Sequence, residues 1–429
     1  MMRRAMLRTV IALALAGALG GAAAAQAQPA VTITYWQYYF ESKVKLMDAL
    51  IPQFERQNPG IHVVQETFPY DSYNQKVASA VPAGQGPDVV NLFYGWLPLY
   101  VDSGYLIPLP QNAFPDAQIE RDFVPMVKAA KFNGKYWALP TAVRTLALFY
   151  NRDMFRRAGV GAPATWDQFV ADAKRLTEYD ARGRITSEGF GISPDGQDHQ
   201  MIREVLFRQW GTAPYSSDGR KVTYNNAAGA AALKWYTDLV TADKVGVIGF
   251  FPGGNGYRDA FVAGKAAMIV DGSFAIGSIR SSAKFDWGVA QLPRRTAGGT
   301  PSNFGSFWVH GLTRKAAGPR QAAAVAFLKF ITSPDVQRMW LQQVGEIPAA
   351  KSLASDPKLA ADPVYGPFIA SLAFAHATFF IDETAQRTVL LDAINQVVLN
   401  HMDPKAALDQ AAGKEQKVLD DFWAKQKHP

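Results

Sequence analysis

Apolar stretches alternate with helix-like segments from residue 31 onward, and this alternation constrains the fold more than any other feature. Residues 31–36, 61–68 and 87–93 are rich in β-branched and aromatic residues, which is typical of buried strands. Between them, residues 41–58 and 71–81 have the spacing of amphipathic helices. Strands separated by helices predict βαβ units, and therefore an α/β fold with a mostly parallel sheet and helices on both faces.

Residues 139–155 (LPTAVRTLALFYNRDMF) start polar, continue as an apolar run, and end in polar residues. The run predicts a strand buried on both faces and followed at once by a helix. Asn151 is a suitable N-cap for that helix, and Asp153 lies where the helix dipole favours a negative charge. We expect this segment to carry the chain from one domain into another.

Later segments continue the alternation. Residues 165–176 predict a helix with Thr165 as N-cap and Gln168 as its capping-box partner. Residues 266–270 predict a buried strand, and residues 285–293 an extended segment that returns the chain to the first domain. The remaining helices are expected at 319–331, 334–344, 388–400 and 406–423.

Composition excludes several classes of protein. The chain has 429 residues, which is too long for one core and suits two domains. Its net charge of +7 includes three arginines of residues 1–27, so the rest of the chain carries 7 − 3 = +4, which is mild, and no Lys/Arg cluster indicates a nucleic-acid surface. The absence of cysteine excludes disulfides, thiolate metal sites and cysteine nucleophiles. We expect no metal, no cofactor and no nucleic-acid partner.

Residues 1–27 have the three parts of a secretory signal. Arg3, Arg4 and Arg8 form a basic front, residues 10–24 are apolar, and residues 25–27 fit an A-x-A cleavage site. The apolar part is short for a membrane span, although an uncleaved anchor is the alternative. Without a cysteine to carry a lipid, an exported chain is expected to be periplasmic and to start near Gln28.

The crossing segment also carries a family resemblance. It resembles the signature of the family 1 extracellular solute-binding proteins of bacterial ABC importers. Thr141 and Arg157 depart from that signature. The matching residues are Pro140, Ala147, Leu148, Phe149, Tyr150, Asn151 and Phe155. Five further patches match the family in the same order: Tyr35-Trp36, Asn58-Pro59-Gly60-Ile61, Pro87-Asp88-Val89-Val90, Phe261-x-x-Gly264-Lys265-x-Ala267-Met268 and Gly345-x-Ile347-Pro348.

The resemblance implies a two-lobed clamshell whose lobes are each discontinuous in sequence. We expect residues 28–143 and 290–340 in lobe 1, and residues 144–289 and 341–429 in lobe 2. The family's carbohydrate-uptake members, which include maltose- and glycerol-phosphate-binding proteins, imply a small sugar-like solute as ligand. They also imply the transmembrane subunits of an ABC permease as partner, and we expect a monomer. A sensor coupled to a chemoreceptor would have the same fold.

Candidate binding residues lie where the predicted strands end, because ligands of open parallel sheets bind beyond the carboxyl ends of the strands. Aromatic faces there suit sugar rings, although each aromatic could instead pack in the core. Asp271 and Ser273 could instead cap the helix that follows. The candidates are Gln37, Tyr38, Tyr39, Tyr94, Trp96, Arg144, Asp271, Gly272, Ser273, Phe274 and Trp308.

Arg144 allows two interpretations. A guanidinium in the crossing segment can hold a carboxylate, sulfonate or phosphate by two-point contact, which predicts an anionic solute such as an acidic sugar or a sugar phosphate. Alternatively, Arg144 pairs with a nearby Asp or Glu at the lobe boundary.

A secreted glycan hydrolase is the competing class, since an aromatic cleft suits that activity too. Such an enzyme needs two facing carboxylates, and the candidate loops supply only Asp271 as an obvious acid. No HExxH or GxSxG motif is present. The sequence therefore favours binding without catalysis.

Overall fold

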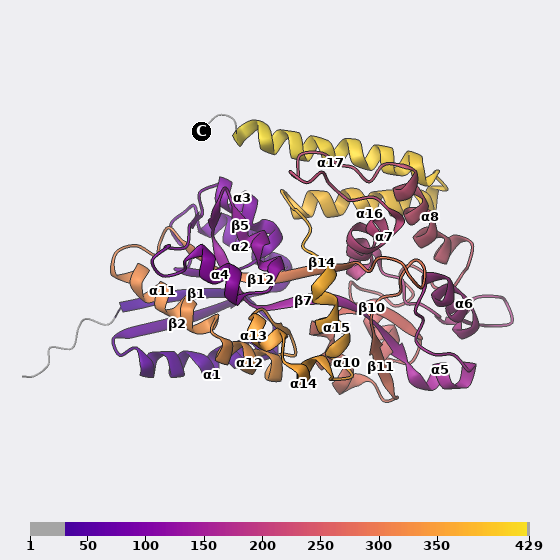
Figure 1. Cartoon of the computed structure of the whole chain (residues 1–429), viewed down its shortest axis with the longest axis horizontal. Coiled ribbons are helices and arrows are strands. Elements are labelled where there is room, and N and C mark those ends of the chain that lie inside the picture. Colours follow the sequence, from indigo (N-terminus) through magenta and orange to yellow (C-terminus); the bar gives the residue numbers. More distant parts are fainter. Residues whose placement is uncertain (1–30, 427–429) are drawn as a thin grey trace, which may run out of the picture.

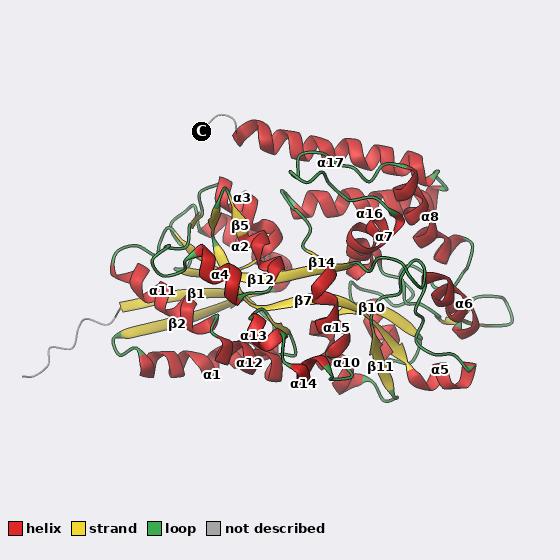
Figure 2. Cartoon of the chain, in the orientation of Figure 1, coloured by secondary structure: helices red, strands yellow, loops and turns green. Residues whose placement is uncertain are grey.

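One sheet of ten strands runs through the computed structural model, which describes residues 31–426 (Figures 1 and 2). The strand order along its main path is β10-β7-β12-β3-β1-β2. The ten strands are β1 Val31–Tyr38, β2 Ile61–Phe68, β3 Val89–Phe93, β4 Leu106–Ile107, β7 Ala138–Asn151, β10 Met268–Gly272, β11 Trp287–Ala290, β12 Asn303–Thr313, β13 Ile347–Pro348 and β14 Ala375–His376. Two small hairpins are added by β5 Lys131–Phe132 with β6 Lys135–Tyr136, and by β8 Glu178–Tyr179 with β9 Ile185–Ser187.

Helices cover the sheet and fill the spaces beside it. The longer ones are α1 Glu41–Gln57, α2 Tyr70–Ala80, α6 Trp166–Leu176, α8 Ala227–Thr241, α11 Pro319–Ile331, α12 Pro334–Gln343, α16 Glu383–Asn400 and α17 Pro404–Gln426. The shorter ones are α3 Leu97–Asp102, α4 Asp116–Asp122, α5 Arg152–Ala158, α7 Phe207–Trp210, α9 Gly256–Val262, α10 Ile276–Ser282, α13 Lys351–Ala354, α14 Pro357–Ala360 and α15 Gly366–Ser371. None of the helices in the described part of the chain combines the length and apolar character that a membrane span needs.

Local chemistry explains where several helices begin. The Asn151 side chain accepts from the backbone N–H groups of Asp153 and Met154, so the predicted N-cap of α5 is confirmed. The Thr165 hydroxyl accepts from the N–H of Gln168 at the start of α6, as predicted, whereas the Gln168 side chain accepts from the N–H of Ala164. In a capping box the Gln168 side chain would accept from the N–H of Thr165, but here it accepts from the N–H of the preceding residue.

Two long strands cross the molecule in opposite directions. β7 begins beside β12, and it ends beside β10 and β11. The first part of β12 pairs with the middle of β7, and its last residues lie between β3 and β4. Because one strand leaves the first lobe and the other returns to it, they pair antiparallel and bring antiparallel neighbours into a sheet whose β1–β2 and β1–β3 pairs are parallel.

The return to the first lobe is made by β12. Residues 285–293, which the sequence suggested for that role, contain β11, and β11 pairs with the far end of β7. An extended segment of either kind has the same composition, so only its pairing partner distinguishes a crossing strand from a local one.

The buried apolar side chains form two clusters. The first spans both halves of the molecule, since it includes Phe261 of α9, Ile269 of β10 and Ile276 of α10, and the second lies in one half. The first cluster also surrounds β1 and β3 and includes Tyr35, Phe54 and Phe327. The other lies among α6, α8, α16 and α17 and includes Trp166 and Leu390. The fold is two-lobed, with β7 and β12 linking the lobes and α16 and α17 lying along one side (Figure 1). The predicted leader at 1–27 lies outside the described residues.

Candidate functional site

Four aromatic side chains of the first lobe form a continuous surface, called here the aromatic wall: Tyr38, Tyr70, Trp96 and Trp308. The rings of Tyr38, at the end of β1, and Trp308, in β12, have centroids 4.2 Å apart. Trp96 meets Trp308 edge to face at 5.3 Å, and Tyr70 meets Tyr38 in the same way at 5.3 Å. Tyr70 is 58% exposed. Trp96 is half-buried, whereas Tyr38 and Trp308 are buried, so the accessible apolar surface of the wall is that of Tyr70 and part of Trp96.

An ion cluster lies beside the wall and consists of Lys43 of α1, Arg144 of β7 and Glu346. Lys43 Nζ and Arg144 Nε donate to the same Oε1 atom of Glu346, at 3.0 and 2.7 Å. Trp340 Nε1 donates to the other oxygen at 2.8 Å. Burial alone would raise the pKa of Glu346, but Arg144 and Lys43, together with the Trp340 N–H, lower it to about 2. Glu346 is therefore a carboxylate at all physiological pH values.

The ion cluster connects to the aromatic wall through Tyr38. The Tyr38 hydroxyl oxygen accepts from Lys43 at 2.7 Å and from Arg144 at 3.5 Å. Lys43 is enclosed, because its Nζ also lies 5.2 to 5.8 Å from the ring centroids of Tyr38, Phe40 and Trp340. The charge of Lys43 is thus directed into the protein and away from solvent.

The second lobe contributes Phe274, which lies between two guanidinium groups. Arg144 Cζ is 4.9 Å and Arg258 Cζ is 5.4 Å from its ring centroid. Arg258 Nε donates to Asp271 Oδ2 at 2.7 Å, so Asp271 is a buried ion-pair partner. A Cβ on Gly272 would lie 2.4 Å from the Phe274 ring, which explains the glycine there. Among residues 31–426, the buried Ser273 hydroxyl has no hydrogen-bond partner.

The structure places the other candidates away from this surface. Gln37 is buried, and its amide donates to Gln65 Oε1 at 2.6 Å. Tyr94 is buried against Phe307, with its hydroxyl donating to the backbone oxygen of Thr378 at 3.1 Å. Tyr39 is exposed and forms no ring contact with the wall among the described residues. The structure thus brings together Tyr38, Trp96, Arg144, Phe274 and Trp308, with Asp271, Gly272 and Ser273 directly behind Phe274.

Sequence reasoning missed four neighbours of this surface: Lys43, Tyr70, Glu346 and Glu383. Tyr70 follows the second parallel strand, so the rule applied to the first and third strands would have found it. Glu346 lies inside the patch Gly345-x-Ile347-Pro348, where only its neighbours were considered. Glu383 is the first residue of α16, a helix that begins five residues before its expected start. Burial raises the pKa of the Tyr70 hydroxyl, and the charge of Glu383 raises it further.

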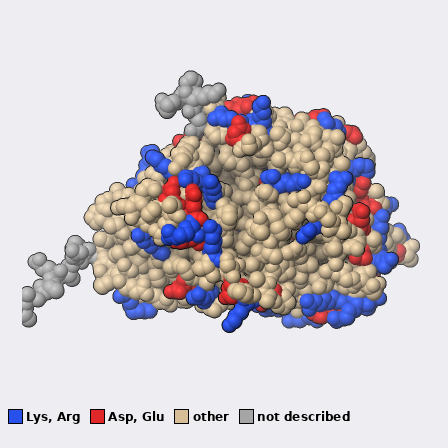
Figure 3. Space-filling view, viewed as in Figure 1, with Lys and Arg blue, Asp and Glu red and all other residues tan. Residues whose placement is uncertain are grey.

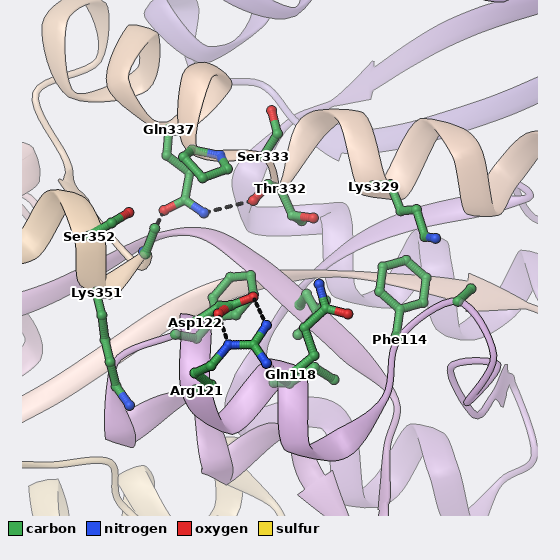
Figure 4. Close-up of a pocket in the computed structure, with 16 residues that line it drawn as sticks. Phe114, Gln118, Arg121, Asp122, Lys329, Thr332, Ser333, Gln337, Lys351 and Ser352 are labelled. Carbon is green, nitrogen blue, oxygen red and sulfur yellow. Dashed lines mark hydrogen bonds and ion pairs between the residues drawn. The ribbon is translucent and has the colours of Figure 1, made fainter.

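A separate hollow of about 550 Å³ lies on the first lobe between α4, the α11–α12 junction and α13 (Figure 4). Its main polar groups already have partners. Arg121 donates to Asp122 at 2.8 Å, and the buried Gln337 amide donates to Thr332 and accepts from the N–H of Ala350.

Charges and potential metal ligands do not indicate another kind of site. On the face shown in Figure 3, basic and acidic side chains are intermingled over both lobes. Among residues 31–426, no group of three or more His, Asp or Glu side chains is arranged to hold a metal ion.

Comparisons with known proteins agree with this geometry. A family model described as bacterial extracellular solute-binding protein matches residues 49–367. The chain is 26% identical to the galactooligosaccharide-binding protein of Bacillus subtilis, over 84% of each chain. It is also 26% identical to the sn-glycerol-3-phosphate-binding periplasmic protein of Escherichia coli, over 78% of each chain.

Solved structures have the same fold. The GacH receptor of Streptomyces glaucescens, which was solved unliganded and in complex with acarbose, superimposes with a TM-score of 0.79 at 24% identity. The superposition covers 91% of this chain and 98% of the receptor. At that identity the likeness concerns the fold.

Proposed function

Because this chain belongs to the bacterial extracellular solute-binding protein family, we propose that it is the periplasmic substrate-binding component of an ABC importer. It captures a carbohydrate or a sugar-like solute between its lobes and delivers that solute to the transmembrane subunits of the permease. The proposal includes the lobe limits given above, a cleaved leader at 1–27, and a monomeric protein without a lipid anchor.

One observation carries this proposal: the aromatic wall of the first lobe lies beside polar groups that come from the crossover and the second lobe. Sugar rings have apolar faces that stack on aromatic side chains, and their edges carry hydroxyl groups that need donors and acceptors. Tyr70 and Trp96 supply the accessible stacking surface, and the buried rings of Tyr38 and Trp308 pack against them. Arg144 and Glu383 supply polar groups on the other side.

Capture follows from the division of the site between the lobes. A ligand that contacts both halves makes more contacts when the lobes are closed, so it shifts the equilibrium toward the closed form. A closed form presents both lobe surfaces to the permease at a fixed angle. Names of relatives support a sugar or a sugar-like ligand, since they include a galactooligosaccharide-binding protein and a receptor solved with acarbose.

The alternative of an anionic solute has weaker support, although one relative is named for sn-glycerol 3-phosphate. Arg144 is paired with Glu346, as in the second of the two interpretations of this residue. Lys43, the other cation of the ion cluster, is directed into the protein. Both cations donate to Glu346. Because two cations share one carboxylate, the cluster keeps a net positive charge, and the preference for a neutral solute rests on the names of the sugar-binding relatives.

Hydrolysis is also disfavoured. The acids near the wall are Glu346 and Asp271, which are held by cations, and Glu383. A glycosidase needs one free nucleophile or base opposite one protonated acid. We therefore expect binding without turnover.

A thermal-shift panel on the exported form tests the proposal, run beside a hydrolysis assay. The panel contains neutral mono- and oligosaccharides, polyols, uronic acids and sugar or glycerol phosphates. A ligand at 100 times its dissociation constant adds about 2.7 kcal/mol of stability, which raises Tm by several degrees. A shift from neutral sugars without product formation is expected. No shift from any carbohydrate, or turnover of one, would contradict the proposal.

A further inference from the structure

The last helix, α17, has one buried stripe that belongs to two different apolar clusters. The stripe enters the second cluster, among α8, α16 and α17, through Ala407, Leu408, Ala411 and Ala412. Its last turns enter the cluster that surrounds β1 and β3, through Leu419 and Phe422. Steps of three or four residues keep these side chains on one face of the helix. A single rigid helix of 23 residues thus packs in both clusters.

The contact with the first lobe is made by Phe422. Its ring centroid lies 6.0 Å from that of Phe132 in β5, and the two residues are 4% and 8% exposed. Figure 1 shows the C-terminal end of α17 reaching over α3 and β5. The first lobe holds the β5 segment in place, because the Phe132 backbone oxygen accepts from Trp137 Nε1 at 2.9 Å. The adjacent Lys131 pairs with Asp116 of α4 at 2.7 Å.

The second lobe fixes α17 about two turns before this contact. Glu415 forms a buried ion pair with Arg203 at 2.7 Å. The next residue, Gln416, is bonded in both directions. Its amide donates to the backbone oxygen of Arg220 at 2.8 Å, and its side-chain oxygen accepts from the N–H of Val222 at 2.9 Å. The last two turns of the helix therefore extend from a fixed base in one lobe to a fixed segment of the other.

We propose that the ring pair Phe132–Phe422 is a clasp that holds the two lobes in the arrangement of this structure and opens when they move. β7 and β12 link the lobes in every arrangement, whereas the clasp joins two side chains that are held by different lobes. Separation of the rings exposes apolar surface to water, which is unfavourable. The clasp thus contributes to the free-energy difference between lobe arrangements. This inference goes beyond the proposed function, because it concerns the ligand-free protein and is the same for any solute.

Distances between two spin labels, measured by pulsed electron paramagnetic resonance on the ligand-free protein, test the clasp. The chain contains no cysteine, so two introduced cysteines are the only labelling sites. Ser79→Cys in α2 places one label on the first lobe, and Ala171→Cys in α6 places the other on the second lobe. Both positions are exposed.

The variants in this labelled background are Phe422→Ala, Phe132→Ala and their combination. Phe132→Ala leaves α17 unchanged, so it tests the clasp even if Phe422→Ala weakens the helix. Phe330→Ala is the matched control, because Phe330 forms a ring pair with Phe54 inside the first lobe, at a centroid distance of 5.5 Å. It removes the same kind of side chain without a contact between lobes.

We expect each single variant to raise the population of a second label distance, relative to the main one, by about threefold to tenfold, which is what the loss of one aromatic pair supplies. The double variant should resemble the stronger single variant, because both substitutions remove the same contact. Phe330→Ala should give the wild-type distribution. All variants should unfold in one cooperative transition when they are heated and followed by circular dichroism.

Three results would overturn the clasp: a wild-type distribution in both single variants, effects that add fully in the double variant, or the same second distance in Phe330→Ala. The measurement uses no ligand, so none of these results bears on the proposed function. A thermal-shift panel without any hit would overturn the proposed function and leave the clasp intact.

Discussion

The molecule contains two buried Arg–Glu clusters that differ in access and in charge balance. Under the C-terminal helices, Arg203 Nη1 donates to Glu415 Oε1 at 2.7 Å, and Tyr224 donates to the other carboxylate oxygen at 2.6 Å. Arg203 is 1% exposed, and a second donor bond to the backbone oxygen of Gln386 holds α16. Between the lobes, Arg144 shares Glu346 with Lys43 and is 15% exposed.

The difference separates a structural tie from an ion cluster at the proposed ligand site. The sealed cluster matches one cation to one carboxylate and joins α16 and α17 to the residues around 203, so removal of either partner leaves an uncompensated charge. The cluster between the lobes matches two cations to one carboxylate and adjoins the aromatic wall, in which Tyr70 is 58% exposed. If Arg144 is removed, Glu346 therefore keeps its bonds from Lys43 and Trp340.

The largest effect is expected in the sealed cluster. Arg203→Ala should lower the free energy of unfolding by about 3 to 5 kcal/mol, because Glu415 would remain buried without its cation. Urea titration followed by circular dichroism measures the loss. As a control, Arg203→Met with Glu415→Leu should cost less than Arg203→Ala alone, since no charge remains. A loss below about 1 kcal/mol in Arg203→Ala would show that the cluster is not a tie.

An intermediate effect is expected for Asp198, a buried acid that forms no salt bridge with the described part of the chain. Asp198 accepts from the Ser193 N–H and from the Tyr236 hydroxyl, both at 2.7 Å, and burial raises its pKa to about 7. The folded state then holds a proton that the unfolded chain releases near pH 4, so this group lowers stability as pH rises from about 4 to 7.

Asp198→Asn should remove that loss, because an amide oxygen can accept the same two bonds. Relative to wild type, the variant should gain about 3 kcal/mol between pH 4 and pH 8. Unfolding free energies at both pH values measure the gain. An equal difference between variant and wild type at the two pH values would mean that Asp198 ionises in the fold without cost.

The smallest effect on stability is expected at Arg144. Arg144→Ala should cost about 1 to 2 kcal/mol, since Glu346 keeps its bonds from Lys43 and Trp340. Arg144→Lys serves as the control and should cost less. Urea titration again measures both, and a loss as large as that of Arg203→Ala would remove the contrast between the clusters.

Local features of this fold could be predicted from sequence where the cause lies within a few residues. The caps at Asn151 and Thr165 depend on side chains two or three residues from their backbone partners, and both were found. Arg144 was singled out because it is a cation in a long apolar strand. Its partner Glu346 could not be named, because the two residues are 202 positions apart in the chain and only the lobe packing joins them.

The same reason explains the incomplete prediction of the site. The rule for parallel strands led to Tyr38 and Trp96, since strand ends are visible in the apolar pattern. Glu383 belongs to a helix that carries only weak periodicity at its start, and its role depends on which residues the other lobe presents. Sequence periodicity therefore does not predict which residues of the two lobes contact each other at such a site.

Small-angle X-ray scattering directly tests whether the protein captures a solute by closure of its two lobes. The radius of gyration of the exported form would be measured without ligand and with a saturating amount of the sugar that gives the largest thermal shift. Ligand contacts shared by both lobes predict a smaller radius in the bound state. An unchanged radius, with binding verified by calorimetry on the same sample, would contradict capture by closure.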